Sequence, residues 1–336
     1  MKRLLTAVML VVMILSVQIN NTKAEEIITD GTVINDQYDR LFSYDVAFKD
    51  FHQAFTPEMF NGSEVVDRKI ERSDYGRIDD SYTYTYADGC ILCVSSGLNL
   101  FYYNADGDYY SQIITYLDSA GDCTGGPELS GFTVKDATEQ CNRLLARLGL
   151  RDLVPDTITT FSKERLTRIT DEMKREYAGH PKVMYFTSFT DETEAYYLTY
   201  RQVLNGMRSA GTPQVRIVVT RNGIAYLEMF RIIDRITGTR PVTEKMPWQE
   251  AVQCFKKRNI NVYSIPASIS VSYGIREISI QYYYGFDTQN DNALFAHVFP
   301  GWDIKGYESM RSADREKERL IHDFYRIPDG AWYYPD

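Results

Sequence analysis

The sequence predicts an α+β fold, in which an antiparallel β-meander precedes two units that each pack a helix on antiparallel strands. Three observations support this prediction. Tyrosine occurs 26 times among 336 residues, and aromatic residues favour strands. Two Asp-Gly pairs separate short alternating runs, as in β-hairpins. Farther along the chain, amphipathic helical patterns twice precede further strand-like runs.

The composition is that of a folded, acidic chain. Hydrophobic residues make up 44% of the sequence and charged residues 25%, which argues against disorder. The formal net charge is −9, so we do not expect a nucleic-acid binder that depends on phosphate contacts. The length favours two or three domains.

The N-terminal segment has the order of a secretory signal. Two basic residues precede an apolar run over 4–17, which at about 14 residues is too short to span a bilayer. Thr22 and Ala24 are the small residues expected before a cleavage site. We therefore predict a secreted or extracytoplasmic protein with a signal peptide over 1–24 and no membrane span after cleavage. An uncleaved N-terminal anchor is the alternative.

Residues 25–125 are predicted to form a domain with one helix and a meander. The helix is expected within 38–56, where four aromatic residues from Tyr44 to Phe55 recur at helical spacing. From residue 81 the period changes to two, which favours strands. The four expected strands are 82–86, 90–95, 98–104 and 109–117.

Residues 126–240 are predicted to be the first helix-on-strand unit. Thr133 and Asp136 resemble a capping box at the start of a helix that Gly149 ends. A second helix is expected at 162–177. An Asn-Gly pair joins the last two expected strands and is a strong hairpin signal. The four strands expected in this unit are 183–189, 195–204, 214–220 and 224–233.

Residues 241–336 are predicted to be the second unit. Segment 246–251 repeats the order of residue types in 132–137, namely large apolar, helix opener, apolar, polar, acidic and alanine. It opens an expected helix over 246–258. The strands expected after it lie near 268–273, 276–284 and 294–299.

Two stretches carry a family resemblance. FTVKDATEQCNRLLARLGL, which starts at Phe132, resembles the helix of PepSY-like modules. REISIQYYYG, NALFAHVFPGWDIKGY and FYRIPDGAWYY resemble the C-terminal part of YycH/YycI-like exported proteins of Gram-positive, clostridial-type bacteria. The resemblance covers residues 130–336. It implies two PepSY-like units, no catalysis, and regulation by contact with the outer part of a sensor kinase or with a protease.

No motif predicts a reaction, a metal or a cofactor. Cys90 and Cys93 form a C-x-x-C pair within an expected strand, whereas a thioredoxin-like site needs a helix N-terminus. They are expected to be two buried cysteines, or Cys93 pairs with Cys123 in a disulfide. The glycine-rich run around Cys123 resembles the nucleophile loop of trypsin-like proteases, but the only upstream histidine, His52, lies in an expected helix. The four histidines lack metal-site spacing.

The tyrosines are the remaining candidates for a site. Tyr103, Tyr109 and Tyr283 belong to runs of neighbouring tyrosines that must point to both faces of a sheet, so some are core and some are exposed. We predict that they contact a protein partner at the cell envelope, and that the chain is an exported, non-enzymatic binding or regulatory protein. The alternative is a secreted glycan-binding protein or glycan hydrolase that uses the tyrosine-rich faces.

Overall fold

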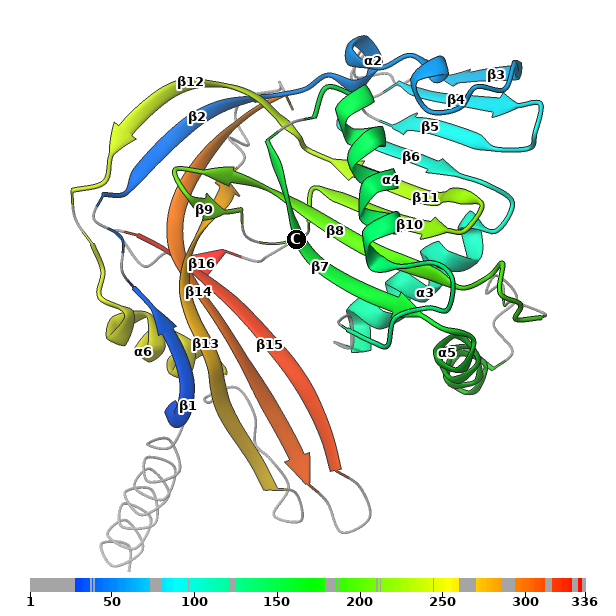
Figure 1. The fold of residues 1–336 in the computed structure, drawn as a ribbon. Helices are drawn as coiled ribbons and strands as arrows, with labels where there is room; N and C mark the ends of the chain where they lie inside the picture. The colour runs from blue at the N-terminus through cyan, green and yellow to red at the C-terminus, as the bar shows by residue number, and fades with distance from the viewer. Residues whose placement is uncertain are drawn as a thin grey trace, which may run out of the picture. The chain divides into compact units, whose positions relative to one another are not determined.

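The chain divides into two compact units (Figure 1). Unit 1 comprises Met1–Ser43, Arg240–Gln281 and Phe299–Asp336, and unit 2 comprises Tyr44–Thr239 and Tyr282–Val298. The computed structural model describes residues 28–36, 38, 40–72, 80–95, 97–120, 125–150, 152–178, 185, 188–209, 211, 213–243, 245–259, 270–285, 294–311, 316–327 and 332–333. The predicted signal peptide lies outside these residues, as does most of the strand expected at 183–189.

The predicted α+β fold with two helix-on-strand units is wrong. Of the described residues, 51% lie in strands and 24% in helices, and the strands form two large sheets. Strands expected in the meander and strands expected in the first PepSY-like unit pair directly, because Phe101 lies opposite Glu228. Pairing between these distant segments therefore places in one sheet the strands that the sequence assigned to two separate domains.

Unit 2 is built on an antiparallel nine-stranded sheet. Eight strands follow one another in the order β3-β4-β5-β6-β11-β10-β8-β7, and β9 pairs with β8. Their bounds are β3 Val65–Glu71, β4 Ser81–Tyr86, β5 Ile91–Ser95, β6 Asn99–Tyr103, β7 Leu153–Phe161, β8 Ala195–Leu204, β9 Met207–Arg208, β10 Val215–Thr220 and β11 Gly223–Phe230. The predicted hairpin at Arg221-Asn222-Gly223 is confirmed, since Thr220 pairs with Gly223.

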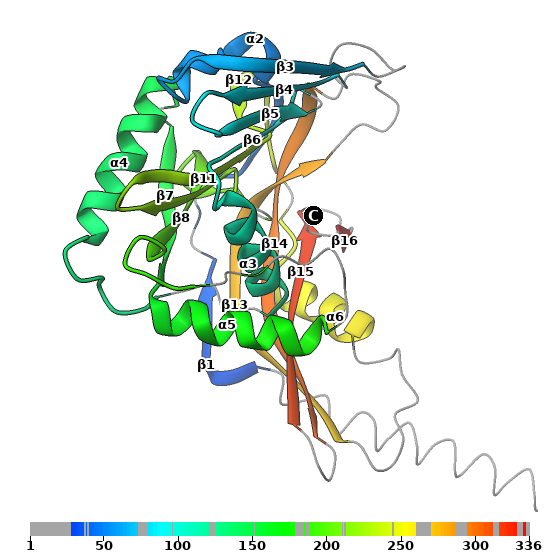
Figure 2. The ribbon, with the colours of Figure 1, turned by 90° about the vertical axis from the view of Figure 1, so that its right-hand side faces the viewer.

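Helices lie on both faces of this sheet (Figures 1 and 2). One face carries α4 (Val134–Arg147) together with the short α2 (Phe51–Ala54) and a 3-10 turn over Pro57–Met59. The other face carries α3 (Gly107–Ala120) and α5 (Lys163–Glu176). Each face consequently has its own apolar core.

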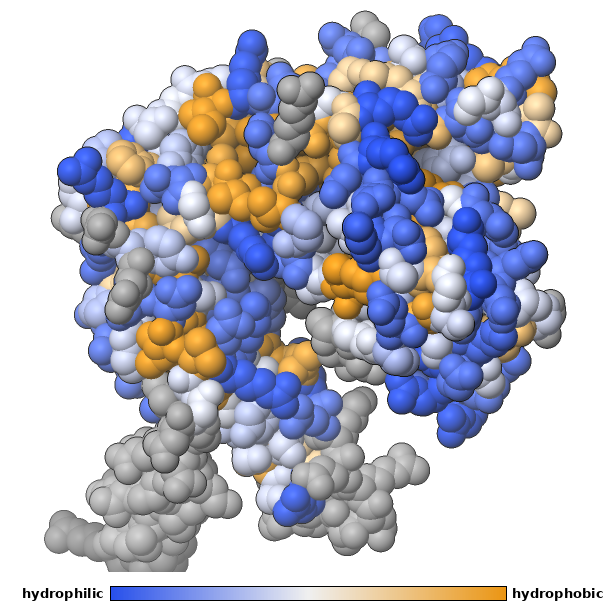
Figure 3. Space-filling model, viewed as in Figure 1, coloured by the Kyte–Doolittle hydropathy of each residue, from blue (hydrophilic) through white to orange (hydrophobic). Residues whose placement is uncertain are grey.

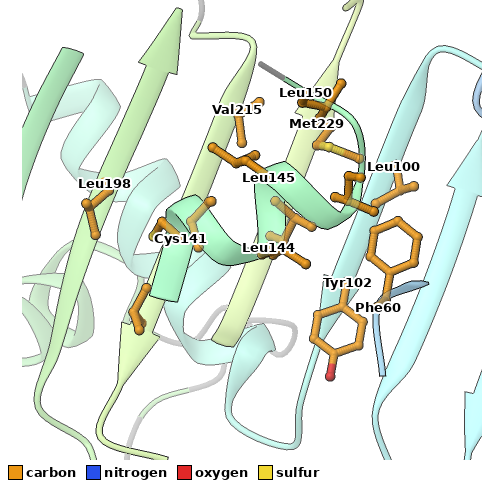
Figure 4. Packing of buried hydrophobic residues seen from close by; sticks show 14 of the residues in the cluster. Phe60, Leu100, Tyr102, Cys141, Leu144, Leu145, Leu150, Leu198, Val215 and Met229 are labelled. Atoms are coloured by element: carbon orange, nitrogen blue, oxygen red, sulfur yellow. The ribbon is translucent and has the colours of Figure 1, made fainter. Parts of the chain in front are cut away.

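The predicted helix after Thr133 is confirmed as α4. The side chain of Thr133 accepts a hydrogen bond from the amide of Asp136, and the Asp136 carboxylate accepts one from the amide of Thr133. Together they form a capping box. Figure 4 shows Cys141, Leu144 and Leu145 on the side of α4 that meets the sheet, and all three are buried. The outward side of α4 is hydrophilic (Figure 3).

Strand β8 contributes to both cores by simple alternation. Tyr196, Leu198 and Tyr200 belong to the core under α4, whereas Ala195 and Tyr197 belong to the core under α3 and α5. A strand that is buried on both faces reads as a nearly continuous apolar run. The abundant tyrosines of this region therefore serve largely as core residues.

Two segments have a secondary structure that differs from the predicted one. The expected strand at 109–117 is part of helix α3, whose buried residues Tyr110, Ile113, Ile114 and Leu117 recur at helical spacing. The expected helix within 38–56 is a strand, β2 (Phe42–Phe48), followed by the four-residue α2. Pairing of β2 with β14 over Tyr44–Ala47 explains why the extended form prevails there.

The described part of unit 1 consists of a sheet and one helix. The helix α6 (Trp248–Asn259) confirms the helix expected at 246–258. The indole Nε1 of Trp302 donates to the Met246 carbonyl at 2.7 Å, just before α6. β1 pairs in parallel with β13, whereas β14 pairs antiparallel with β15 and β15 with β16. The bounds are β1 Ile28–Asn35, β12 Ile233–Pro241, β13 Ser270–Gly285, β14 Phe295–Arg311, β15 Glu316–Arg326 and β16 Trp332–Tyr333, and β2, β12, β13 and β14 each have residues in both units.

Candidate binding surface

Strands β4, β5 and β6 carry half-buried side chains on the face of the sheet that bears α3. In one cross-strand row Thr85 lies opposite Ile91 and Ile91 opposite Tyr103. In the next row Thr83 lies opposite Cys93 and Cys93 opposite Phe101. We call this surface the open face; it comprises Thr83, Thr85, Ile91, Cys93, Phe101 and Tyr103.

The opposite side of the same three strands is filled by core residues. Leu92, Val94, Leu100 and Tyr102 are all buried there, and Tyr102 stacks against Phe60 with ring centroids 6.2 Å apart (Figure 4). We call this side the covered face. The open face differs because α3 packs on β6 and β11, and its core contains no residue of β4 or β5 among those described.

Two of the predicted binding residues pack against the same core beside the open face. Tyr103 ends β6, Tyr109 lies in the first turn of α3, and both are half-buried and pack against the core under α3. Gly107 makes this tight connection possible. A Cβ atom at Gly107 would stand 2.1 Å from the Tyr103 Cβ and 2.9 Å from the Ala225 carbonyl oxygen. Burial, and then the charge of Asp108, raise the pKa of the Tyr103 phenol.

The third predicted residue, Tyr283, has a different environment. It lies in β13 and is 7% exposed, and its neighbour Tyr282 is fully buried. Tyr284 also takes part in internal contacts, because its hydroxyl accepts a hydrogen bond from the Gln214 side chain at 3.2 Å. Burial raises the pKa of Tyr284 to about 12. This run of tyrosines therefore contributes mainly to the interior.

The cysteine predictions are resolved only in part. Cys90 is buried and Cys93 is half-buried on the open face, with Sγ 3.8 Å from the Thr83 hydroxyl. Cys123 lies outside the described residues, so a Cys93–Cys123 disulfide stays a prediction. Burial raises the pKa of the Cys90 thiol, which disfavours the thiolate that redox catalysis needs.

An ion-pair cluster continues the second row of the open face toward α3. Glu228 lies opposite Phe101, and its carboxylate is 3.4 Å from the Arg216 guanidinium. Asp118 of α3 contacts the same guanidinium at 2.9 Å, and Tyr226 donates to Glu228 at 3.3 Å. The aromatic part of the open face is thus bordered by charges that already have partners.

A separate polar cluster occupies unit 1. The buried carboxylate of Asp303 on β14 contacts His322 Nε2 on β15 and accepts a hydrogen bond from Gln281 Nε2 at 2.8 Å. Lys305 Nζ lies 3.8 Å from Asp303 and 3.0 Å from Glu277. A buried carboxylate can hold an imidazole in one orientation, as it does for a histidine base. Among the described residues, however, His322 contacts no hydroxyl or thiol that it could activate.

This cluster was missed in the sequence because strand register creates it. His322 and Asp303 are 19 residues apart and meet across the β14–β15 pair. His297 likewise contacts Asp45 across the β14–β2 pair. The described residues contain no group of three or more histidine, cysteine or acidic side chains that could hold a metal ion. No signal in the linear spacing of the histidines would have revealed either pair.

A hollow of about 490 Å³ lies beside α4. It is lined by Gly131, Phe132, Asp136, Glu139, Gln140, Arg143 and Arg221. Its charged side chains come from the outward side of α4 and from the β10–β11 turn, and none of its lining residues is a tyrosine. The predicted tyrosines therefore do not line this hollow. None of the described helices is both long enough and apolar enough to cross a membrane.

Comparison with known proteins shows a shared fold. No protein-family profile matches the chain, and no curated protein matches it either. Among solved structures, an uncharacterized protein from Eubacterium rectale is similar, with a TM-score of 0.63 at 12% identity. The similarity covers 92% of this chain and 92% of that protein. At this identity the match defines the class of fold, which extends over nearly the whole chain.

Proposed function

We propose that the chain is a non-catalytic binding protein and that a protein partner docks on the open face. The observation that carries this proposal is that the core under α3 contains no described residue of β4 or β5, and that Phe101 and Tyr103 on the neighbouring β6 stay half-buried. Tyrosine and phenylalanine supply large contact areas at protein interfaces, whereas charged residues are depleted at interface centres. The paired charges of Glu228 and Arg216 would then lie at the polar rim.

The class of partner follows from the sequence resemblance. A membrane sensor's outer domain or an exported protease would meet this chain at the cell envelope. The predicted export of the chain is part of the same proposal. A contact that modulates such a partner needs an accessible face with aromatic anchors, and Tyr103 and Tyr109 would be those anchors.

The test is capture of partners from detergent-solubilised cell envelope with the chain immobilised without residues 1–24. The double variant Tyr103→Ser/Tyr109→Ser should recover at least about tenfold less of an enriched partner. Tyr273→Ser, at a half-buried tyrosine of unit 1, is the matched control and should retain capture. Equal capture by both variants would overturn the proposal. Retention of wall polysaccharide alone, or loss of binding after glycan digestion, would favour the alternative of a glycan-binding protein.

A further inference from the structure

Strand β3 forms an edge of the nine-stranded sheet. It pairs with β4 on one side, and no other described strand pairs with its far side. Six of its seven residues, from Val66 to Glu71, are exposed. An edge strand presents unpaired backbone N–H and C=O groups, which can hydrogen-bond to an added strand. The upper right of Figure 3 shows hydrophobic side chains among hydrophilic ones at this end of the molecule.

Two exposed aliphatic side chains flank an arginine on β3. Val66 is 60% exposed and Ile70 is 42% exposed, although β3 also carries charged side chains, which usually protect such edges, at Asp67, Arg68, Lys69 and Glu71. Between them, Arg68 places its guanidinium 5.5 Å from the ring centroids of both Tyr82 and Tyr84. This cation–π geometry draws the charge toward the strand face instead of leaving it extended into solvent.

The Arg68 guanidinium is positioned by two tyrosine rings, but no described carboxylate balances its charge. Among the described residues Arg68 has no carboxylate partner, although Asp67 and Glu71 lie on the same strand. Tyr82, one of the two rings beneath it, also packs on the buried His52 ring at 4.5 Å. The tyrosine support is thus fixed by the core, and the guanidinium is available for a carboxylate brought by another chain.

We propose that β3 accepts an extended segment of the protein partner as an added antiparallel or parallel strand. This segment carries a carboxylate opposite Arg68 and an apolar residue two positions away, which would contact Ile70. Val66 lies at the bulge between Val65 and Asp67, where the alternation of side chains is interrupted. Backbone pairing would supply affinity, and the alternating side chains would supply specificity. The inference rests on the proposed function, because the added strand would extend the sheet whose open face begins at Thr83, opposite Lys69.

Two defined peptides test the charge requirement. One is the capped heptapeptide Thr-Val-Thr-Glu-Thr-Val-Thr, and the other has Lys in place of the central Glu. The full chain should bind the Glu peptide at least about tenfold more tightly than the Lys peptide. Arg68→Glu should reverse this preference. Arg72→Glu makes the same charge change just beyond the end of β3 and should leave the preference intact.

Hydrogen exchange separates strand addition from side-chain contact alone. Saturation with the Glu peptide should slow exchange of amides in Val65–Glu71, while α5 is unaffected. Failure of both peptides to bind, an unchanged preference in Arg68→Glu, or binding without protection of β3 would each overturn the inference. If Arg68→Glu still captures the envelope partner while Tyr103→Ser/Tyr109→Ser does not, the strand addition is wrong and the proposed function stands.

Discussion

The two faces of strands β4, β5 and β6 show that the packing of helices decides which side chains of a strand are buried. On the covered face, Leu100 and Tyr102 are buried under α2, α4 and the chain around Phe60. On the open face, the residues next to them in sequence, Phe101 and Tyr103, remain half-buried. Both faces carry aromatic residues, so composition does not distinguish them. The difference teaches that neighbouring residues of one aromatic-rich strand are buried or half-buried according to how much helix packs on each face.

The largest effect should separate neighbouring residues on β6. Leu100→Ala removes a side chain with no exposed surface and should lower the free energy of unfolding by about 3 kcal/mol. Phe101→Ala, on the open face, should cost about 1 kcal/mol, because less of its surface leaves water on folding. Urea denaturation of both variants measures the difference. Similar losses would mean that the open face is as well covered as its reverse side.

The next effect concerns the turn that joins the open face to α3. Gly107→Ala forces a methyl group against the Tyr103 Cβ and the Ala225 carbonyl, so the backbone must shift, at a cost of about 1–3 kcal/mol. Gly62→Ala is the matched control, since a Cβ there meets no atom within 4 Å. Thermal melting compares the two. A Gly107→Ala protein as stable as the control would show that this connection tolerates a side chain.

Alkaline titration should sharpen the same comparison. Burial raises the pKa of Tyr102 on the covered face and, together with Asp108, that of Tyr103 on the open face. A pKa raised in the folded state means that the neutral form is favoured there. The contribution of each neutral tyrosine to the stability of the fold is therefore fully present below the unfolded pKa of about 10. It is lost as the pH rises through the folded pKa.

Tyrosinate absorbance measures this effect. Tyr103→Phe should remove one group that ionises before unfolding, whereas Tyr102→Phe should remove one that ionises only with it. The shift of Tyr102 is the larger one, because Tyr102 is buried whereas Tyr103 is half-buried. Removal of a group that ionises before unfolding in both variants would contradict the distinction between the faces.

The smallest effect involves the β4–β5 turn. The Asp88 carboxylate accepts hydrogen bonds from Asn61 at 2.7 Å and Ser63 at 2.8 Å, and these contacts lower its pKa to about 2, with the Asn61 bond as the largest cause. A lowered folded pKa stabilises the fold above the unfolded value of 3.8, and this stabilisation is lost as the pH falls toward 2. Because Asp88 is exposed, Asp88→Asn should cost at most about 1 kcal/mol at pH 7.

The measurement for Asp88 is the pH dependence of unfolding. The stability difference between the wild type and Asp88→Asn should shrink between pH 5 and about 2, because the wild-type carboxylate becomes protonated over that range. A difference that stays constant across this range would show that the hydrogen bonds do not depend on the charge.

Local signals in the sequence determined several elements of this protein. The capping residues Thr133 and Asp136 set the start of α4, and the Asn-Gly pair set the β10–β11 hairpin, because both act through neighbouring backbone groups. Strand β8 matches its predicted bounds because its apolar run is long. These features depend on contacts within a few residues, which the sequence displays directly.

The tertiary structure decided whether certain segments became a helix or a strand. Residues 109–117 follow a turn signal that favours a strand. They form a helix because apolar residues at helical spacing can pack on Phe161, Leu166 and Val218. Residues 42–48 became β2 because β14 offers an edge. The Asp303–His322 contact and the open face around Tyr103 also depend on register and helix placement. Such pairings join distant segments, and no local pattern encodes the free energy they contribute.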